Sequence, residues 1–275
     1  MSRKRRTVAD EPFVDVRSAG GAMLAGQRIV DHAHEWHQLL SVTAGLMTVT
    51  TEVGAWTAPP HWAIWIPAHV RHSIRFVGAS RFASLYVRPG RASALPDRCT
   101  ALAISPLLAA LIDKAHAIGM LDRRDVTEWA IAMLIAAELQ EIPVAPFTLP
   151  QPRGEAMRRV TERIADQQAD RPGLALPQLA TAAGIGLRTL ERHFLTETGM
   201  TIGQWRRHRL LLIGLETLAA GGSVKAAAAA AGYATPSAFV AAFRQSFGVT
   251  PGRYFSPDIE EPVPGPQQPS NPAGK

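Results

Sequence analysis

The chain has 275 residues, of which 47% are hydrophobic, and a formal net charge of +6. This length suits two domains, and the hydrophobic content excludes a wholly disordered chain. The longest apolar run, residues 129–137, is too short to cross a membrane, and no hydrophobic signal core follows the basic start. A lone Cys99 excludes an internal disulfide framework and predicts a reducing, cytoplasmic location. The basic excess lies in residues 151–256, which favours nucleic acid as an anionic partner.

Residues 28–88 have the pattern of a β domain. Short runs rich in Val, Thr, Ile and Trp are separated by turn residues, among them Gly45, Gly54 and Gly78. The clearest strands are predicted at 46–50 and 82–88. The tryptophans of this region are expected in the core or in the wall of a pocket.

Two helices are predicted after the strands. Ser105 followed by Pro106 is typical of a helix start and predicts a helix over 107–117. Asp125 and Glu128 have the spacing of a capping box, which predicts a second helix reaching towards Gln140. The second helix is apolar on a wide arc, so a homodimer formed through residues 105–142 is an expectation.

The remainder of the chain divides into a linker, a helical region and a tail. Residues 143–154 hold four prolines and are predicted to link two domains. Residues 155–255 have a helical pattern. The Pro- and Gly-rich residues 257–275 are expected to form a disordered tail.

The helical region contains an internal repeat. Residues 176–201 and 224–250 align, with Gly184 matching Gly232 and Phe194 matching Phe243. Each copy predicts a short helix, a glycine turn and a longer helix, which is the pattern of a helix-turn-helix unit. In the first copy the apolar stripe of the longer helix is Leu187, Leu190 and Phe194, and the opposite polar row is Arg188, Thr189, Glu191 and Arg192. A plain helical bundle with solvated charges is the alternative, but two copies in a basic region favour DNA binding.

The second copy carries the longest motif in the chain. Gly232-Tyr233, Ser237-Ala238-Phe239, Ala242-Phe243-Arg244, Phe247-Gly248 and Thr250-Pro251 resemble the C-terminal signature of the AraC/XylS family of transcription regulators. The resemblance implies two helix-turn-helix units that enter successive major-groove segments of double-stranded DNA, with RNA polymerase as a further partner.

The same resemblance implies roles for individual residues. The implied base-reading positions are Arg188, Glu191 and Arg192 in the first unit, and Pro236, Ser237 and Ala241 in the second. The second set has short side chains, so the first unit is expected to supply most of the sequence discrimination. Arg244 is expected to contact phosphate, and so is Arg206 or Arg207.

Six of the nine histidines fall between residues 32 and 72. The spacings His32-x-His34-x3-Gln38 and Pro67-x-His69-x-x-His72 resemble the two motifs of the cupin barrel, with Gln38 where that pattern has a glutamate. Histidines one residue apart in a strand share a face and can share a metal, although an amide is a poorer ligand than a carboxylate. For His32, His34, Gln38 and His72 the sequence leaves three alternatives open: a divalent metal site, an organic effector pocket without metal, or a structural polar core.

These observations predict an α+β multidomain fold. A cupin-like β-barrel sensor domain spans 11–148 with a helical extension at 105–142. An all-α domain spans 155–256, with tandem helix-turn-helix units at 176–198 and 224–247. The predicted function is a sequence-specific regulator that responds to a small-molecule effector, with no membrane partner, no required cofactor and no catalysis. The alternative is a metal-dependent cupin enzyme with an accessory DNA-binding domain, against which Gln38 and the lack of paired carboxylates argue.

Overall fold

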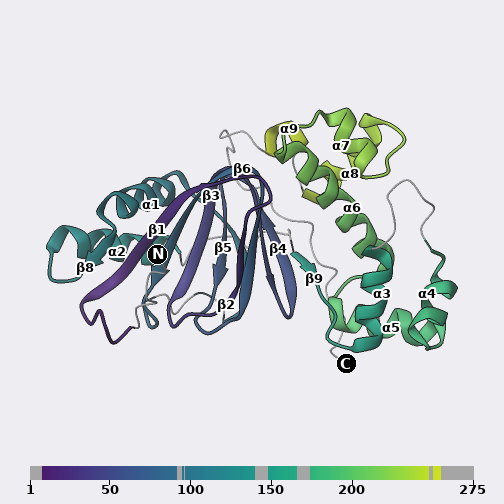
Figure 1. The fold of residues 1–275 in the computed structure, drawn as a ribbon, viewed down its shortest axis with the longest axis horizontal. Helices are drawn as coiled ribbons and strands as arrows, with labels where there is room; N and C mark the ends of the chain where they lie inside the picture. The colour runs from purple at the N-terminus through teal and green to yellow at the C-terminus, as the bar shows by residue number, and fades with distance from the viewer. Residues whose placement is uncertain are drawn as a thin grey trace, which may run out of the picture.

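A computed structural model describes residues 8–91, 95, 97–139, 148–165, 174–247 and 250–254. The N-terminal half is a bent sheet with two helices at one end, and the C-terminal half is helical (Figure 1). In the described part of the chain, no helix has the length and apolar character that spanning a membrane requires. The tail predicted at 257–275 lies outside the described residues.

The described residues form nine strands of a single antiparallel sheet. These are β1 (Val14–Met23), β2 (Arg28–His32), β3 (His37–Thr51), β4 (Gly54–Ala58), β5 (Trp62–Ile66), β6 (His72–Val87), β7 (Thr100–Ala103), β8 (Met120–Asp122) and β9 (Thr148–Pro150). The long strands β3 and β6 pair along almost their whole length. β5 and β1 flank one half of this pair, and β4 and β2 flank the other. The halves therefore face different neighbours, as they must in a sheet that curls into a barrel.

Gly45 and Gly78 do not end strands, so that part of the sequence prediction is wrong. Gly45 lies within β3 with φ +77°, and Gly78 lies within β6 with φ +72°. The register of the β3–β6 pair shifts between Val42 and Leu46. A glycine in the left-handed region allows a bulge that bends a strand without ending it. The two long strands consequently continue through the bend.

Helices α1 (Pro106–Ile118) and α2 (Val126–Glu138) cover one end of the sheet. The Ser105 hydroxyl accepts a hydrogen bond from the Leu108 N–H, as its capping position predicts. Asp125 caps α2, but the Glu128 carboxylate accepts from the N–H of Asp122 instead of Asp125. The predicted capping box is therefore not reciprocal, because the Asp125 N–H already donates to the Asp122 carbonyl. Glu138 ends α2, and residues 140–142 of the predicted extension lie outside the described part.

The C-terminal half contains the helices that the repeat predicts. The described ones are α3 (Glu155–Ala165), α4 (Leu176–Ala183), α5 (Leu187–Thr198), α6 (Ile202–Ala219), α7 (Val224–Ala230), α8 (Pro236–Phe247) and α9 (Pro251–Tyr254). In Figure 1, α6 runs between two groups, with α3, α4 and α5 at one end and α7, α8 and α9 at the other. Phe194 packs with Trp205 in the first group, and Phe243 packs with Phe239 and Tyr254 in the second.

The barrel and the second helical group share one hydrophobic core. Val49 and Phe76 of the barrel belong to the same buried cluster as Leu215 and Phe243. At its edge, the backbones of Gly78 and Ala219 approach so closely that a Cβ on the glycine would lie 2.6 Å from the Ala219 carbonyl oxygen. The two halves are therefore packed against each other.

Part of the predicted linker is a strand. β9 pairs with β4, and the Pro150 carbonyl accepts a hydrogen bond of 2.8 Å from Nε1 of Trp205 on α6. The sequence pattern misses this strand because the four prolines of residues 143–154 are typical of a loop. Proline is tolerated at a sheet edge, where one face of the ladder needs no donor.

Candidate DNA interface and histidine cluster

The first helix-turn-helix unit consists of α4, a turn and α5. Gly184 ends α4 in the left-handed conformation with φ +72°, and its N–H donates to the Thr181 carbonyl. Leu190 and Phe194 of α5 are fully buried. Arg188, Glu191 and Arg192 are exposed on the surface of α5, and Thr189 is half-buried. The predicted polar row is thus accessible to a partner.

Leu187 does not belong to the apolar stripe of α5, so that prediction is wrong. Its side chain is 37% exposed, whereas Leu190 is fully buried. Leu187 is the first residue of the helix. A side chain in a helix points towards the N-terminus of that helix, so the Leu187 side chain lies over the preceding turn and does not reach the core.

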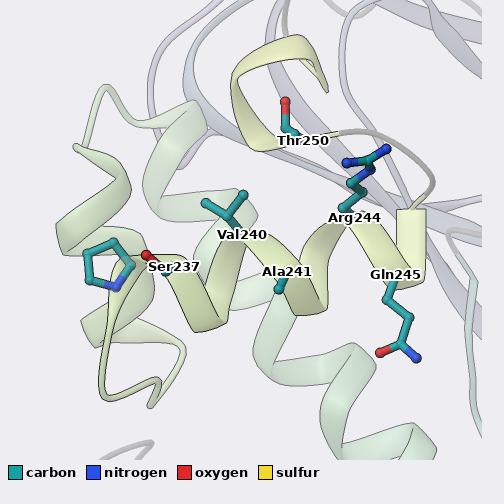
Figure 2. Close-up of a pocket in the computed structure, with 7 residues that line it drawn as sticks. Ser237, Val240, Ala241, Arg244, Gln245 and Thr250 are labelled. Atoms are coloured by element: carbon teal, nitrogen blue, oxygen red, sulfur yellow. The ribbon is translucent and has the colours of Figure 1, made fainter.

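The second unit presents a hollow on the exposed face of α8. Pro236, Ser237, Ala241 and Arg244, the residues predicted from the family resemblance, are all exposed. Together with Val240, Gln245 and Thr250 they line a hollow of about 750 Å³ (Figure 2). The short side chains of Ser237 and Ala241 leave the helix backbone accessible, and Arg244 adds a positive charge beside them. Such a surface suits the backbone of a nucleic acid.

Arg206 is engaged within the protein. One of its Nη atoms donates to the Leu174 carbonyl, and burial lowers the pKa of its guanidinium. This contact ties the segment before α4 to α6. Arg207 remains exposed, so of this pair it is the one available to phosphate.

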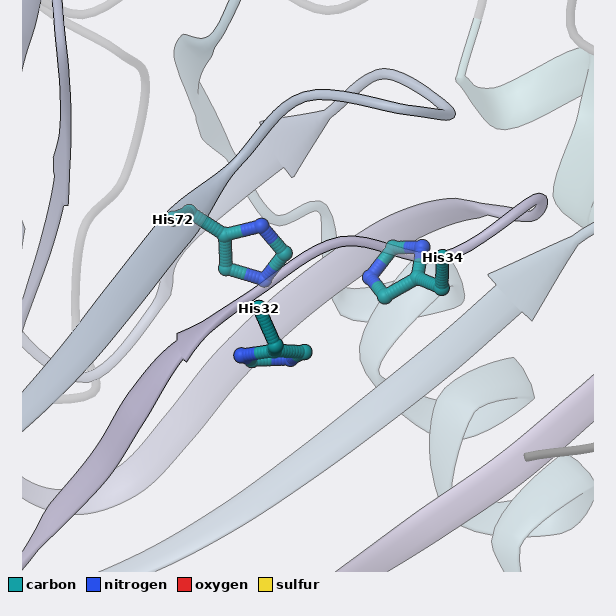
Figure 3. Close-up of side chains that lie close together, drawn as sticks. All are labelled: His32, His34 and His72. Atoms are coloured by element: carbon teal, nitrogen blue, oxygen red, sulfur yellow. The ribbon is translucent and has the colours of Figure 1, made fainter. Parts of the chain in front are cut away.

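Three histidines converge at one end of the barrel. His32 ends β2, His34 lies in the following loop, and His72 begins β6 (Figure 3). His32 and His72 are register partners in the β2–β6 pair. One ring nitrogen from each of the three lies within 4.8 Å of the others. His34 is not in a strand, contrary to the expected strand geometry, but the loop returns its ring to the cluster.

Gln38 joins the cluster from β3. Its Oε1 lies 3.0 Å from Nε2 of His34, and its Nε2 donates to the Ser84 hydroxyl at 2.6 Å. Gln38 also contacts the hydroxyl of Tyr86, its register partner on β6. Ser84 and Tyr86 are not predicted from the sequence, because only the β3–β6 register brings them to Gln38.

His69 and His37 lie outside the cluster. His69 is exposed with φ +67°, and its N–H donates to the His34 carbonyl at 2.7 Å. It therefore fixes the loop through its backbone. His37 stacks on Trp65 at 4.9 Å between ring centroids.

Burial favours the neutral form of two of the three histidines. Desolvation lowers the pKa of His72 to about 4, and it also lowers the pKa of His34. His72 has no exposed surface at all. His34 and His72 therefore favour the neutral form near neutral pH.

The fold and these two sites define a DNA-binding regulator with a ligand-binding barrel. Residues 18–144 match the family model described as an AraC-like ligand binding domain, and residues 179–256 match a helix-turn-helix domain. The chain is 31% identical over 225 residues to the HTH-type transcriptional regulator NimR of Escherichia coli, covering 82% of this chain and 81% of that protein. The chain belongs to the AraC/XylS family of transcription regulators.

Other similar proteins match a shorter part of the chain or match it at lower sequence identity. The HTH-type transcriptional regulator RipA of Corynebacterium glutamicum is 31% identical over 118 residues, which is 43% of this chain and 34% of that protein. Among solved structures, unsaturated fatty acid bound ToxT from Vibrio cholerae aligns with 92% of this chain and 96% of its own, at 9% identity and a TM-score of 0.36.

Proposed function

We propose that this regulator binds a small-molecule effector in its barrel and thereby changes how its two helix-turn-helix units occupy DNA. In this proposal residues 11–148 form the sensor and residues 155–256 form the DNA-binding domain. The base-reading side chains are Arg188, Glu191 and Arg192, assisted by Thr189. On the second unit Pro236, Ser237 and Ala241 lie against the groove, and Arg244 contacts phosphate.

The arrangement of the two units along α6 carries this proposal. An 18-residue helix is about 27 Å long. Successive major-groove segments on one face of DNA are about 34 Å apart. The two units lie at opposite ends of α6, and the width of each unit adds to the distance that they span together. The two units can therefore enter neighbouring major-groove segments of one duplex.

The shared core supports a route from effector to DNA. Residues of β6 lie in the histidine cluster at one end of the strand and against α6 further along it. A ligand that shifts β6 would therefore shift the helix that joins the two units. Action in the cytoplasm on promoters read by RNA polymerase, and a homodimer formed through α1 and α2, belong to the same proposal.

We propose no catalytic role for the barrel. An amide cannot act as a general acid or base, and Gln38 stands where the cupin pattern has a carboxylate. Within the described residues, the cluster of potential ligands contains histidines alone. The described part of the cluster therefore lacks the carboxylate that the cupin pattern supplies to the alternative enzyme.

Footprinting of the full chain on duplexes selected from a randomised library tests the proposal. We expect two protected major-groove segments about one helical turn apart. Arg192→Ala should weaken protection of one segment, and Arg244→Ala should weaken protection of the other. A single protected segment that both variants affect alike would contradict the two-unit arrangement.

A further inference from the structure

The three clustered histidines share a hydrogen-bonding pattern that fixes their tautomers. Nδ1 of His32 lies 2.9 Å from the Val30 carbonyl, that of His34 lies 2.6 Å from the Trp36 carbonyl, and that of His72 lies 2.9 Å from the Val70 carbonyl. Each carbonyl belongs to a residue two positions away in the chain. A carbonyl oxygen accepts a hydrogen bond and cannot donate one, so each neutral imidazole carries its hydrogen on Nδ1. The three Nε2 atoms are left with lone pairs.

Nε2 of His72 is buried and has no hydrogen-bond partner among the described residues. An unpaired polar atom in the interior costs free energy that native proteins rarely leave uncompensated. Its ring centroid lies 4.3 Å from that of His32 and 5.1 Å from that of His34. The bare lone pair therefore belongs to the centre of the cluster.

Gln38 presents a second unmatched lone pair. Its amide nitrogen is committed to Ser84 and Tyr86, which directs Oε1 towards His34. The single N–H of His34 is already used by the Trp36 carbonyl. Two acceptor atoms consequently face each other across 3.0 Å with no hydrogen between them. A cation bound to both atoms resolves this conflict.

We propose that Nε2 of His32, His34 and His72, with Oε1 of Gln38, form a binding site for a divalent transition-metal ion. Nitrogen-rich sites of this kind suit borderline ions such as Zn²⁺ and Co²⁺. Bonds of about 2.0–2.1 Å place the ligand atoms of a tetrahedral ion about 3.3 Å apart. One ring nitrogen of each histidine lies within 4.8 Å of the other two, so small side-chain rotations would close the site on the ion. The backbone carbonyls hold the rings from outside, as is usual for metal-ligating histidines.

A rival arrangement needs no metal. If the Gln38 amide is turned over, its nitrogen donates to Nε2 of His34 and its oxygen accepts from Ser84 and Tyr86. The oxygen and nitrogen of an amide are assigned from such networks, so this arrangement has to be tested by binding. It predicts a purely polar cluster.

Metal titration of the full chain decides between these arrangements. Protein purified in chelator-free buffer is stripped with a chelator, dialysed, and titrated with CoCl₂ while the absorption bands of bound Co²⁺ are recorded; ZnCl₂ then competes. We expect about one tightly bound ion per chain, as in other closed histidine sites. His32→Ala and His72→Ala should each weaken binding at least about 100-fold, because a lost ligand costs more than a lost hydrogen-bond partner of a ligand, which costs about 10–100-fold. The matched control is His69→Asn, which removes a neighbouring exposed imidazole and should leave binding unchanged.

Gln38→Glu is the decisive variant. A carboxylate is a stronger ligand than an amide, so metal affinity should rise at least about tenfold if Oε1 points at the ion. His32 is only partly buried, so its alanine variant keeps the test valid if the His72 variant fails to fold. No saturable Co²⁺ binding, an equal loss in the His69 variant, or unchanged affinity in Gln38→Glu would each overturn the proposal. Because binding is measured without DNA, none of these outcomes bears on the proposed regulator function.

Discussion

Arg75 on β6 forms an ion pair with Glu216 on α6, and so joins the barrel directly to the helix between the two helix-turn-helix units. Both side chains keep about a third of their surface exposed, with 36% and 32% accessible. A pair of this kind contributes on the order of 0.2–1 kcal/mol to stability. Its position at the junction is therefore of more consequence than its strength.

Arg75→Ala should alter DNA binding with little change in stability. We expect a melting temperature within a few degrees of wild type but a measurable change in affinity for a selected operator, because α6 loses a fixed contact with β6. Arg71→Ala is the control, since Arg71 and Asp31 form an exposed ion pair that joins two residues of the barrel domain and does not involve α6. Equal effects of the two substitutions on operator affinity would show that the junction has no special role.

Gly214→Ala should destabilise the second helical group. A Cβ at this position of α6 would lie 2.5 Å from the Phe239 ring and 3.2 Å from the Ala227 carbonyl oxygen. Overpacking a core in this way costs about 1–3 kcal/mol. Gly203→Ala is the matched control in the same helix, because a Cβ there meets no atom within 4 Å. That variant should be neutral or stabilised by up to about 1 kcal/mol through helix propensity, as denaturant melts would measure.

Phe194→Ala and Phe243→Ala should each cost about 3–5 kcal/mol, because both rings are fully buried in the cores of their units. Leu187→Ala should change the free energy of unfolding by less than about 0.5 kcal/mol, because that side chain is exposed and packs on little. Urea titration gives both quantities. A large cost at Leu187 would mean that α5 meets the core through another face.

Arg192→Ala should cost about 1–3 kcal/mol on the operator and relax the preference at one base pair, if its guanidinium reads a guanine. Arg192→Lys is the second variant, because it keeps the charge and loses the planar fork of donors. For a base contact the lysine variant should resemble the alanine variant. For a phosphate contact it should retain most of the affinity, and the loss in the alanine variant should be uniform across sequences.

Alkylation of Cys99 should be slow in the folded protein and should become fast only when the chain unfolds. Burial raises the pKa of its thiol to about 12, so the reactive thiolate is scarce in the folded chain. Raising the pH from 7 to 9 should accelerate alkylation of an unfolded control, whose thiol titrates near 8.5. The folded protein should show a much smaller increase. A folded-state rate that follows the titration of a free thiol would contradict the burial of Cys99.

The sequence predicts the parts of this molecule that rest on local or periodic signals. The repeat around Gly184 and Gly232 predicts the helices of both units, because glycine turns and apolar stripes are short-range features. The sequence predicts the long strands only in fragments, because glycines such as Gly45 and Gly78 are typical of strand ends, whereas in this barrel they bend the strands. The histidine cluster was predicted as a set of residues from a motif resemblance. Its partners Ser84 and Tyr86 depend on the register between β3 and β6, which no local pattern specifies.

The junction between the halves limits how this chain can be recombined. In a regulator whose two halves are joined only by a flexible linker, the sensor domain could be exchanged by cutting the chain within the linker. Here Val49 and Phe76 share buried surface with Leu215 and Phe243, and β9 is hydrogen-bonded to both halves. A chimera cut within residues 148–154 would uncover apolar surface on each side of the graft. The transplantable unit therefore includes the matching face of α6, and sensor and reader in this lineage are expected to have diverged together.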